Sequence, residues 1–472
     1  MGFNKIVLIV LTLFLLLFSV SAVSAADLIV NDNTTHKNIT DWMNNDTTVK
    51  GNKLVFNVSS YELNDTIKVT KQVDIVSNKN TKINFYESKD MFYISTSGIT
   101  FSGLTLNHHG QGKWDSYSAT IFANSSSNTI NFNKMVFNLN NNYQAGILIK
   151  NWQGTISNSI FNGKDDFIIA IASNNFKGNI YDNSIKVSGY SNFGVFISKW
   201  TGSIYDSTLS SSDDVSALIS VDNWIGSIYR SSLSMKGEDN MGIYAFKWKG
   251  NVRNTKISAS DTRSTGILSY EWIGGLYNSN IVVSGVKSTG LFVNGIWNGK
   301  ISKSKIYTNA KGSFGVYIFS PKSKGTISKS TVSAKKGRAI SVPKSIKIKN
   351  TKVFAKNKAF KILILGPKLV VGRVQYSFAN ILLDYMGREG SRYYIIEIYN
   401  LGEYSSKTSS LVITASGYKK VINVKSIKSG NSREITVALP KRLSNSKYKK
   451  YAKIIYYDGN NKKITSKSLK FK

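Results

Sequence analysis

The chain has 472 residues with no cysteine and three histidines, which excludes disulfide frameworks and the usual Cys/His zinc sites. Its formal net charge of +35 favours a polyanionic partner such as nucleic acid, anionic membrane or acidic wall polymer. Most of the excess lies in residues 321–472, which carry 34 Lys and Arg against 6 Asp and Glu, a net of +28. The alternative is a solvated surface that only keeps the protein soluble.

Residues 1–26 predict a secretory signal. Lys5 supplies the positive start, Ile6–Val20 the apolar run and Val23-Ser-Ala25 a small-residue cleavage site. The alternative is an uncleaved anchor, although the apolar run is short for a membrane span. We therefore expect a secreted protein at the cell surface or cell wall, with no integral membrane span after cleavage. Secretion also argues against nucleic acid as the natural partner.

Residues 27–57 are rich in Asn and Thr and are expected to cap the N-terminal end of a solenoid, because such an end exposes unpaired backbone. Thr40 or Asp41 is the expected cap of a short helix there. Asn-x-Ser/Thr acceptors occur only before residue 127, and they are candidate glycosylation sites unless they arise by chance in an Asn-rich segment. These acceptors are Asn33, Asn38, Asn45, Asn57, Asn64 and Asn124.

A repeat centred on a large aromatic residue organises the middle of the chain. Its spacing is 24 residues, except for a last spacing of 25. The aromatic positions are Trp152, Phe176, Trp200, Trp224, Trp248, Trp272 and Trp297. Two residues after each aromatic comes a glycine, and four residues after it comes an aliphatic residue. One further repeat keeps this phase with Ser323 in the aromatic position.

The period and the local pattern together predict the fold. A fixed period of this length indicates a solenoid, and short alternating apolar runs cut by Gly, Ser, Asn and Asp indicate strands. Strands of successive coils then pair in parallel, and such connections are right-handed. We predict an all-β protein in which residues 58–365 form a right-handed parallel β-helix of roughly a dozen coils.

Two sets of residues resemble known families. Tyr61-Glu-Leu-Asn-Asp-Thr-Ile-Lys-Val69 and Ile99-Thr-Phe-Ser-Gly-Leu-Thr-Leu106 resemble the opening coils of archaeal surface β-helix proteins, the adhesin-like proteins of methanogens. Ile204-Tyr-Asp-Ser-Thr-Leu209 and Ile327-Ser-Lys-Ser-Thr-Val332 resemble the repeat of pectate-lyase-like folds. The resemblance covers roughly residues 50–360. It implies the fold and leaves the activity open, since binders and polysaccharide-cleaving enzymes share these coils.

Residues 366–472 predict a second, basic domain, a small antiparallel Ig-like β-sandwich. Its short motifs Tyr399-Asn-Leu-Gly402 and Gly417-Tyr-Lys-Lys420 resemble CARDB-like Ig modules of archaeal and bacterial surface proteins. The expected strands are Leu369–Tyr376, Ile381–Tyr385, Tyr393–Tyr399, Ser410–Thr414, Val421–Val424, Glu434–Leu439, Tyr451–Tyr457 and Ile464–Leu469. The expected polyanion-binding residues are Lys441, Arg442, Lys447, Lys449, Lys450 and Lys453.

Two aromatic columns are candidates for contact with sugars. The repeated tryptophans could form an exposed stripe, but their position before x-Gly favours a stack inside the core. Five residues after the aromatic position, alternation turns a second column outward, and we assign it to carbohydrate binding. This second column consists of Tyr181, Tyr205, Tyr229, Arg253 and Tyr277. Ordinary strand surface is the alternative for it.

Acidic residues align in one turn of successive coils. They are Asp165-Asp166, Asp213-Asp214, Glu238-Asp239 and Asp261. Paired carboxylates serve as acid and base in glycosidases and as calcium ligands. Pectate-lyase-like and polygalacturonase-like enzymes carry such acids beside a His, Lys or Arg, whereas His36, His108 and His109 all lie upstream here. Solvated turns are therefore the preferred interpretation, and we assign no catalytic residue, no metal site and no cofactor.

The expected function is that of a non-catalytic, adhesin-like surface protein. Its β-helix stalk would present a face that binds glycans or another cell, and its basic C-terminal region would hold it to acidic cell-wall polysaccharide. The alternative is a β-helix polysaccharide lyase or glycoside hydrolase. A catalytic cleft needs long loops over one face, and the strict period between Trp152 and Trp272 leaves little room for them.

Overall fold

The computed structural model describes most of the solenoid and separate stretches of the C-terminal region. The described residues are 26–45, 51–113, 116–308, 310–357, 360–362, 369–371, 375–376, 393–400, 408–415, 418–426, 432–438, 451–457 and 463–470. They contain one helix, α2 (His36–Asn44), and 44 strands. The predicted secretory signal lies outside the described residues except for Ala26, as does the expected strand Ile381–Tyr385.

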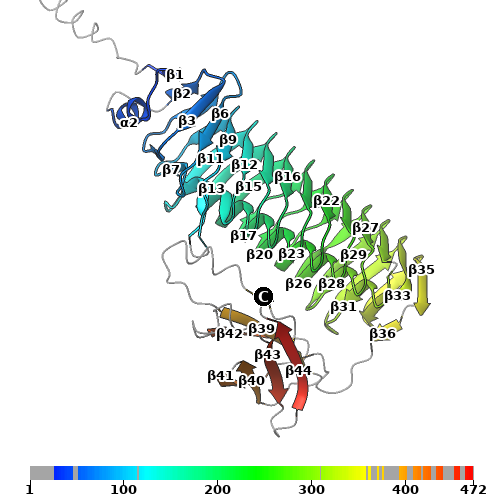
Figure 1. Cartoon of the computed structure of the whole chain (residues 1–472). Helices are drawn as coiled ribbons and strands as arrows, with labels where there is room; N and C mark the ends of the chain where they lie inside the picture. The colour runs from blue at the N-terminus through cyan, green and yellow to red at the C-terminus, as the bar shows by residue number, and fades with distance from the viewer. Residues whose placement is uncertain are drawn as a thin grey trace, which may run out of the picture.

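The strands of the solenoid fall into three stacks of parallel pairs, which we name the first, second and third sheets (Figure 1). The first sheet contains β1 (Leu28–Val30), β2 (Lys53–Phe56), β5 (Asp74–Ser77), β8 (Ile99–Ser102), β11 (Asn128–Asn133), β18 (Ile204–Tyr205), β21 (Ile228–Tyr229), β24 (Val252–Arg253), β29 (Trp297–Ser302), β32 (Lys324–Ser328) and β34 (Ile346–Lys349). The second contains β3 (Ser60–Leu63), β6 (Lys82–Phe85), β9 (Thr105–His108), β12 (Val136–Leu139), β14 (Ile160–Gly163), β16 (Ser184–Val187), β19 (Thr208–Ser211), β22 (Ser232–Met235), β25 (Lys256–Ala259), β27 (Asn280–Val283), β30 (Lys305–Thr308) and β35 (Lys352–Asn357).

The third sheet contains β4 (Ile67–Val69), β7 (Phe92–Ile94), β10 (Ser118–Ala123), β17 (Phe193–Thr201), β20 (Ala217–Ile225), β23 (Met241–Lys249), β28 (Thr289–Val293), β31 (Phe314–Ile318) and β36 (Phe360–Ile362). Four longer strands each belong to two sheets. Those shared by the third and first sheets are β13 (Gln144–Ser157), β15 (Ile169–Tyr181) and β26 (Thr265–Tyr277), and β33 (Thr331–Pro343) is shared by the second and third.

The register between coils equals the sequence period. Ile156 pairs with Ile180, which pairs with Ile204 in the next coil. Each position of the repeat therefore forms a column along the solenoid, with a spacing of about 4.8 Å between coils. The predicted right-handed parallel β-helix is confirmed, with about 13 turns.

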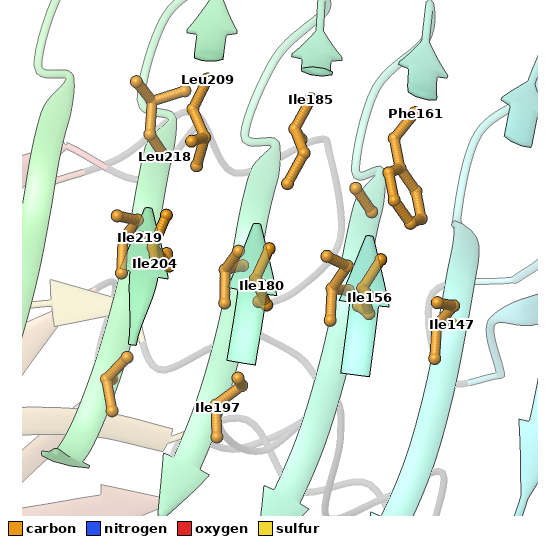
Figure 2. Packing of buried hydrophobic residues seen from close by; sticks show 14 of the residues in the cluster. Ile147, Ile156, Phe161, Ile180, Ile185, Ile197, Ile204, Leu209, Leu218 and Ile219 are labelled. Atoms are coloured by element: carbon orange, nitrogen blue, oxygen red, sulfur yellow. The ribbon is translucent and has the colours of Figure 1, made fainter. Parts of the chain in front are cut away.

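The core is a continuous column of aliphatic and aromatic side chains inside the three sheets. Figure 2 shows how Ile156, Ile180 and Ile204 from the first sheet point to the same interior as Phe161 and Ile185 from the second. All five are completely buried. No single coil encloses its own apolar side chains, so the burial depends on the stacking of neighbours.

The N-terminal end carries helix α2, whose cap differs from the expected one. Thr35 is the N-cap, and its side chain and that of Asn38 form a reciprocal capping box. The expected caps Thr40 and Asp41 lie inside the helix instead, because an Asn at the third helical position makes Thr35 the better start. The parallel ladder also reaches into the segment expected as a cap, since Leu28 of β1 pairs with Leu54 of β2.

Two columns of residues with a left-handed backbone conformation form the turns of the coils. One lies between the first and second sheets, and its members are Lys134, Asn158, Asp182, Asp206, Arg230, Asn254, Asn278, Lys303, Lys329 and Asn350, with φ between 48° and 55°. The other includes Tyr143, Phe167, Ser191, Val215, Asp239, Arg263 and Lys287. Residues of many kinds occupy these positions although only Gly, Asn and Asp favour them, so the stacked coils impose the turn.

The described stretches of the C-terminal region form two antiparallel sheets of four strands each. One is formed by β37 (Leu369–Val371), β38 (Gln375–Tyr376), β39 (Tyr393–Asn400) and β42 (Ser432–Ala438). The other is formed by β40 (Ser409–Ala415), β41 (Tyr418–Val424), β43 (Tyr451–Tyr457) and β44 (Lys463–Lys470). Their strands follow the expected segments closely. The Ig-like character of this region stays a prediction.

Candidate functional site

The column of tryptophans lies inside the solenoid. Trp200, Trp224 and Trp248 are each at most 2% exposed, and consecutive rings stack at 4.9 Å between centroids. Each indole Nε1 donates a hydrogen bond to a backbone carbonyl of the preceding coil, as from Trp224 to Gly202 at 2.9 Å. The preferred interpretation as a core stack is confirmed, and a sugar cannot reach these rings.

The same geometry explains the glycine two residues after each aromatic. A Cβ added at Gly226 would lie 1.7 Å from the carbonyl oxygen of Gly202 and 2.8 Å from Nε1 of Trp224. That carbonyl is the acceptor of the Trp224 indole. The motif of Trp, any residue and Gly is therefore one structural device, in which the glycine admits the carbonyl that satisfies the buried indole.

The predicted column of tyrosines does run along the outside of the first sheet. Tyr181, Tyr205 and Tyr229 are half-buried and their rings are nearly parallel. The ring centroids of Tyr205 lie 5.0 Å from Tyr181 and 4.8 Å from Tyr229. Arg253 is exposed, and its guanidinium carbon lies 4.8 Å from the ring centroid of Tyr277. The structure thus brings all five predicted residues together.

The stacking decides which atoms of this column can meet a ligand. Both faces of the Tyr205 ring are covered by neighbouring rings, and Arg230 lies over the Tyr229 ring at 5.0 Å. A sugar that stacked on an aromatic face would have to displace one of these partners. At Tyr205 and Tyr229, the groups left for a ligand are therefore the phenol hydroxyls and the guanidinium edge of Arg230. Burial is the first cause that raises the pKa of Tyr205, followed by the tyrosines on either side, so the hydroxyl stays a donor at neutral pH.

Arg230 and Asp206 belong to this surface although the sequence analysis did not select them. They lie in the left-handed turn column beside the tyrosines, and the guanidinium donates to both carboxylate oxygens at 2.6 and 2.7 Å. The hydrogen bond from Arg230 is the first cause that lowers the pKa of Asp206. Their spacing of 24 residues is the signal that could have revealed the pair.

The carboxylates of the acidic turns mainly accept hydrogen bonds from backbone amides of neighbouring coils. Oδ1 of Asp214 accepts from the amide of Glu238 at 2.7 Å, and Oδ1 of Asp166 accepts from that of Tyr190 at 2.7 Å. Asp261 accepts from the amide of Gly237 at 2.7 Å. These carboxylates therefore form a ladder of turn caps along one edge of the solenoid.

Arg263 occupies the centre of the acidic turns. It donates to both carboxylate oxygens of Asp239 at 2.8 and 2.9 Å and to Glu238 at 2.8 Å. The hydrogen bond to Asp239 is the largest cause that raises the pKa of Arg263, so the charge is permanent. Among the described residues, no group of three or more His, Asp or Glu side chains is placed to hold a metal ion.

No protein-family model matches the sequence, and no curated protein matches it. Among solved structures, the chain is similar to the A-module of the mannuronan C-5 epimerase AlgE4 from Azotobacter vinelandii, with 11% identity, a TM-score of 0.36 and coverage of 67% of this chain and 91% of that one. It is also similar to tailspike protein 2 of the Escherichia coli O157:H7 bacteriophage CAB120, with 9% identity, a TM-score of 0.33 and coverage of 95% and 69%. A PL6 alginate lyase in complex with a trisaccharide gives 9% identity, a TM-score of 0.28 and coverage of 71% and 97%. These similarities concern the fold alone.

The outer side of the third sheet carries a second aromatic surface, which the sequence analysis missed. Tyr244 lies between the core residues Ile243 and Ala245, so alternation turns it outward. We name this surface the aromatic patch, and its members are Tyr244, Phe246, Tyr270, Phe292, Phe314, Tyr317 and Phe319. The sequence signal for Tyr244 was its position between the core residues Ile243 and Ala245, four residues before Trp248.

The histidines lie far along the chain from the acidic turns. His108 is completely buried beside Phe85, and burial lowers its pKa to about 4. His109 stacks on Tyr86 with 4.6 Å between ring centroids. His36 lies in α2 and contacts the carbonyl of Thr66. None of them belongs to a coil that carries the acidic turns.

The predicted glycosylation acceptors are all exposed in the structure. Asn57, Asn64 and Asn124 lie in turns between strands, whereas Asn33 precedes α2 and Asn45 follows it. Asn38 differs from them, because its side-chain oxygen accepts from Thr35 within the capping box of α2.

The predicted polyanion-binding residues of the C-terminal region cannot be placed. Lys441, Arg442, Lys447, Lys449 and Lys450 lie outside the described residues. Lys453 lies in β43, but its side chain is not described. Over the part of the chain that is described, no helix has both the length and the apolar character needed to cross a membrane.

Proposed function

We propose that the chain is a non-catalytic, secreted surface protein whose β-helix is an adhesin-like stalk that binds a glycan. The observation that carries this proposal is the unbroken outward column of Tyr181, Tyr205, Tyr229, Arg253 and Tyr277 across five successive coils. It presents a row of hydrogen-bond donors with one group per coil. A glycan offers hydroxyl or carboxylate oxygens as a matching row of acceptors.

The contacts made by the acidic residues support glycan binding rather than glycan cleavage. Asp166, Asp214 and Asp261 each accept a hydrogen bond from a backbone amide, and Arg263 forms ion pairs with Glu238 and Asp239. A glycosidase acid must instead exchange a proton with its substrate, which these contacts oppose. The alternative, a polysaccharide lyase or glycoside hydrolase, is therefore the weaker proposal.

The rest of the proposal concerns orientation on the cell. The exposed acceptors from Asn33 to Asn124 occupy the N-terminal end, and the basic excess occupies the other end. A glycosylated outer end and a basic end held to acidic cell-wall polymer suit a surface protein. The Ig-like sandwich over residues 366–472 would belong to the wall-facing end.

The column can be tested by removing hydroxyls while keeping rings. Tyr205→Phe with Tyr229→Phe retains the stack and deletes two donors, so a glycan held by hydrogen bonds should bind about 10- to 100-fold more weakly. Binding of the secreted full chain would first be screened on a glycan array and then measured by calorimetry. Tyr307→Phe, on the second sheet, is the matched control and should leave affinity unchanged.

Two results would contradict the proposal. Equal binding by the double variant and the parent chain would remove the column from the site. Release of reducing ends or unsaturated uronides from any bound polysaccharide, abolished by Asp213→Asn with Asp214→Asn, would establish the enzyme instead.

A further inference from the structure

The last coils of the solenoid carry a crowded group of exposed lysines. It spans the first sheet, the left-handed turn and the second sheet of three consecutive coils. We name it the lysine face, and its members are Lys300, Lys303, Lys305, Lys324, Lys329, Lys347, Lys349 and Lys352. Five of its members lie within the basic segment 321–472, and none is among the expected polyanion-binding residues from Lys441 to Lys453.

The register of the coils aligns these lysines along the solenoid. Lys300 and Lys347 share a column through Thr326, and Lys305 and Lys352 share one through Thr331. Lys303 and Lys329 follow each other in the column of left-handed turns. Neighbouring coils are about 4.8 Å apart, so the positive charges form rows parallel to the solenoid axis.

Within the described residues, the lysine face has no acidic partner. The sequence contains no Asp or Glu between Glu271 and Asp384. Among the described residues, every ion pair lies at or before Arg263, and none involves a member of the lysine face. In the same turn column upstream, Arg230 pairs with Asp206, and the uncharged Asn278 donates to Asn254 at 2.6 Å.

This arrangement is unfavourable for the isolated protein. Lys303 and Lys329 adopt φ of 50° and 49°, a conformation that Asn or Gly accepts at lower cost. Like charges on adjacent coils, about 4.8 Å apart, also lie within the screening length of about 8 Å at physiological salt. A bound polyanion would remove the repulsion, and so the coils are arranged for a ligand rather than for maximum stability.

We propose that the lysine face binds a linear acidic polysaccharide, with its carboxylates along the solenoid axis. A regular polymer with charges at regular intervals matches a protein surface with charges on successive coils. The members are all Lys and none is Arg, which favours a polymer of point charges over nucleic acid, where Arg forks read phosphates and bases. The choice of a polysaccharide over nucleic acid also rests on the extracellular location in the proposed function.

The test compares two variants of the full chain with equal net charge. In one, Lys300, Lys324, Lys347 and Lys349 are changed to Gln. In the control, the exposed Lys186, Lys199, Lys247 and Lys249 of the middle coils are changed to Gln. The probe is polygalacturonate, and duplex DNA and neutral dextran serve as competitors. Affinity would be measured over a range of salt concentrations.

The first variant should bind polygalacturonate about 100-fold more weakly at low salt, and the control within about twofold of the parent. The affinity of the first variant should also fall less steeply with added salt, because its binding releases fewer counterions. Equal losses in the two variants would show attraction by net charge alone and overturn the site. Tighter binding of duplex DNA than of polygalacturonate would overturn the ligand class. The tyrosine column is unaltered in both variants, so binding on the glycan array tests the proposed function separately.

Discussion

The middle coils and the last coils of this solenoid share an interior and differ outside. Ile180 and Ile228 in the middle and Ile301 and Ile327 near the end occupy the same inward column, and all are completely buried. Outside, the stacked Tyr and the hydrogen-bonded Asn, Asp and Arg of the middle coils are replaced by the lysine face. The inward positions therefore fix the coil, and the outward positions are available for binding.

The two regions also differ in the aromatic column. The stack of rings ends at Trp297, and Ser323 occupies the next position, where its hydroxyl accepts from the amide of Trp297 at 2.9 Å. The coils that follow Trp297 lack a buried indole and its hydrogen bond to the preceding coil. We therefore expect them to open more readily than the middle coils.

The largest effect is expected from the aromatic column. Trp224→Ala removes a buried ring that stacks on both neighbours and donates to Gly202, so it should lower the free energy of unfolding by about 3–5 kcal/mol. Lys305→Ala, at the exposed surface of the last coils, should change it by less than about 0.5 kcal/mol. Urea unfolding measures both. Strong iodide quenching of the tryptophan fluorescence in the parent chain would disprove the buried stack.

The next largest effect is expected in the dependence of stability on acid pH, which should differ between the coils near His108 and the last coils. Burial lowers the pKa of His108 to about 4 from an ordinary value of 6.5, so the unfolded state binds more protons between these values. Stability is full above pH 6.5 and should fall by about 3 kcal/mol as pH drops to about 4. His108→Leu should flatten this slope. The coils from Trp272 to Lys352 contain no His, Asp or Glu. The rate of amide hydrogen exchange in these coils should therefore not follow the loss of stability between pH 6.5 and about 4.

The sequence was sufficient for the coil and insufficient for its outer contacts. The period of Trp, Gly and Ile predicted the solenoid, its phase and the inward stack, because buried positions constrain residue type in every coil. The left-handed turns escaped prediction, since Tyr143, Val215 and Lys303 share a conformation without sharing chemistry. The stacking of Tyr205 between two rings also depends on side-chain direction, which a period does not reveal. The aromatic patch was overlooked because its apolar residues resembled core positions.

A smaller effect is expected in the acidic turns. Asp214→Ala removes the acceptor for the amide of Glu238 and should cost about 1 kcal/mol, whereas Asp214→Asn keeps an acceptor oxygen and should cost less. Thermal unfolding of the two variants would show the difference. Equal losses for Asn and Ala would mean that the charge, which both changes remove, holds this turn rather than the hydrogen bond.

The smallest effect is expected at the left-handed turn position of the repeat, where two substitutions should change stability in opposite directions. Arg230→Asn breaks the ion pair with Asp206 and should slightly destabilise the middle coils. Lys329→Asn, in the same turn column, relieves like-charge repulsion and suits the left-handed conformation, so it should slightly stabilise the last coils. Both differences should shrink with added salt. The same sign for both changes would contradict the contrast between the regions.

The most direct test of the division between a shared interior and specialised outer surfaces is hydrogen exchange of the full chain with and without polygalacturonate. We predict slower exchange at the turns around Lys303 and Lys329, and no change at the acidic turns from Asp213 to Asp261. The buried strands of both regions should exchange alike with and without the polymer. Slowing spread evenly along the solenoid, or centred on the acidic turns, would contradict the account.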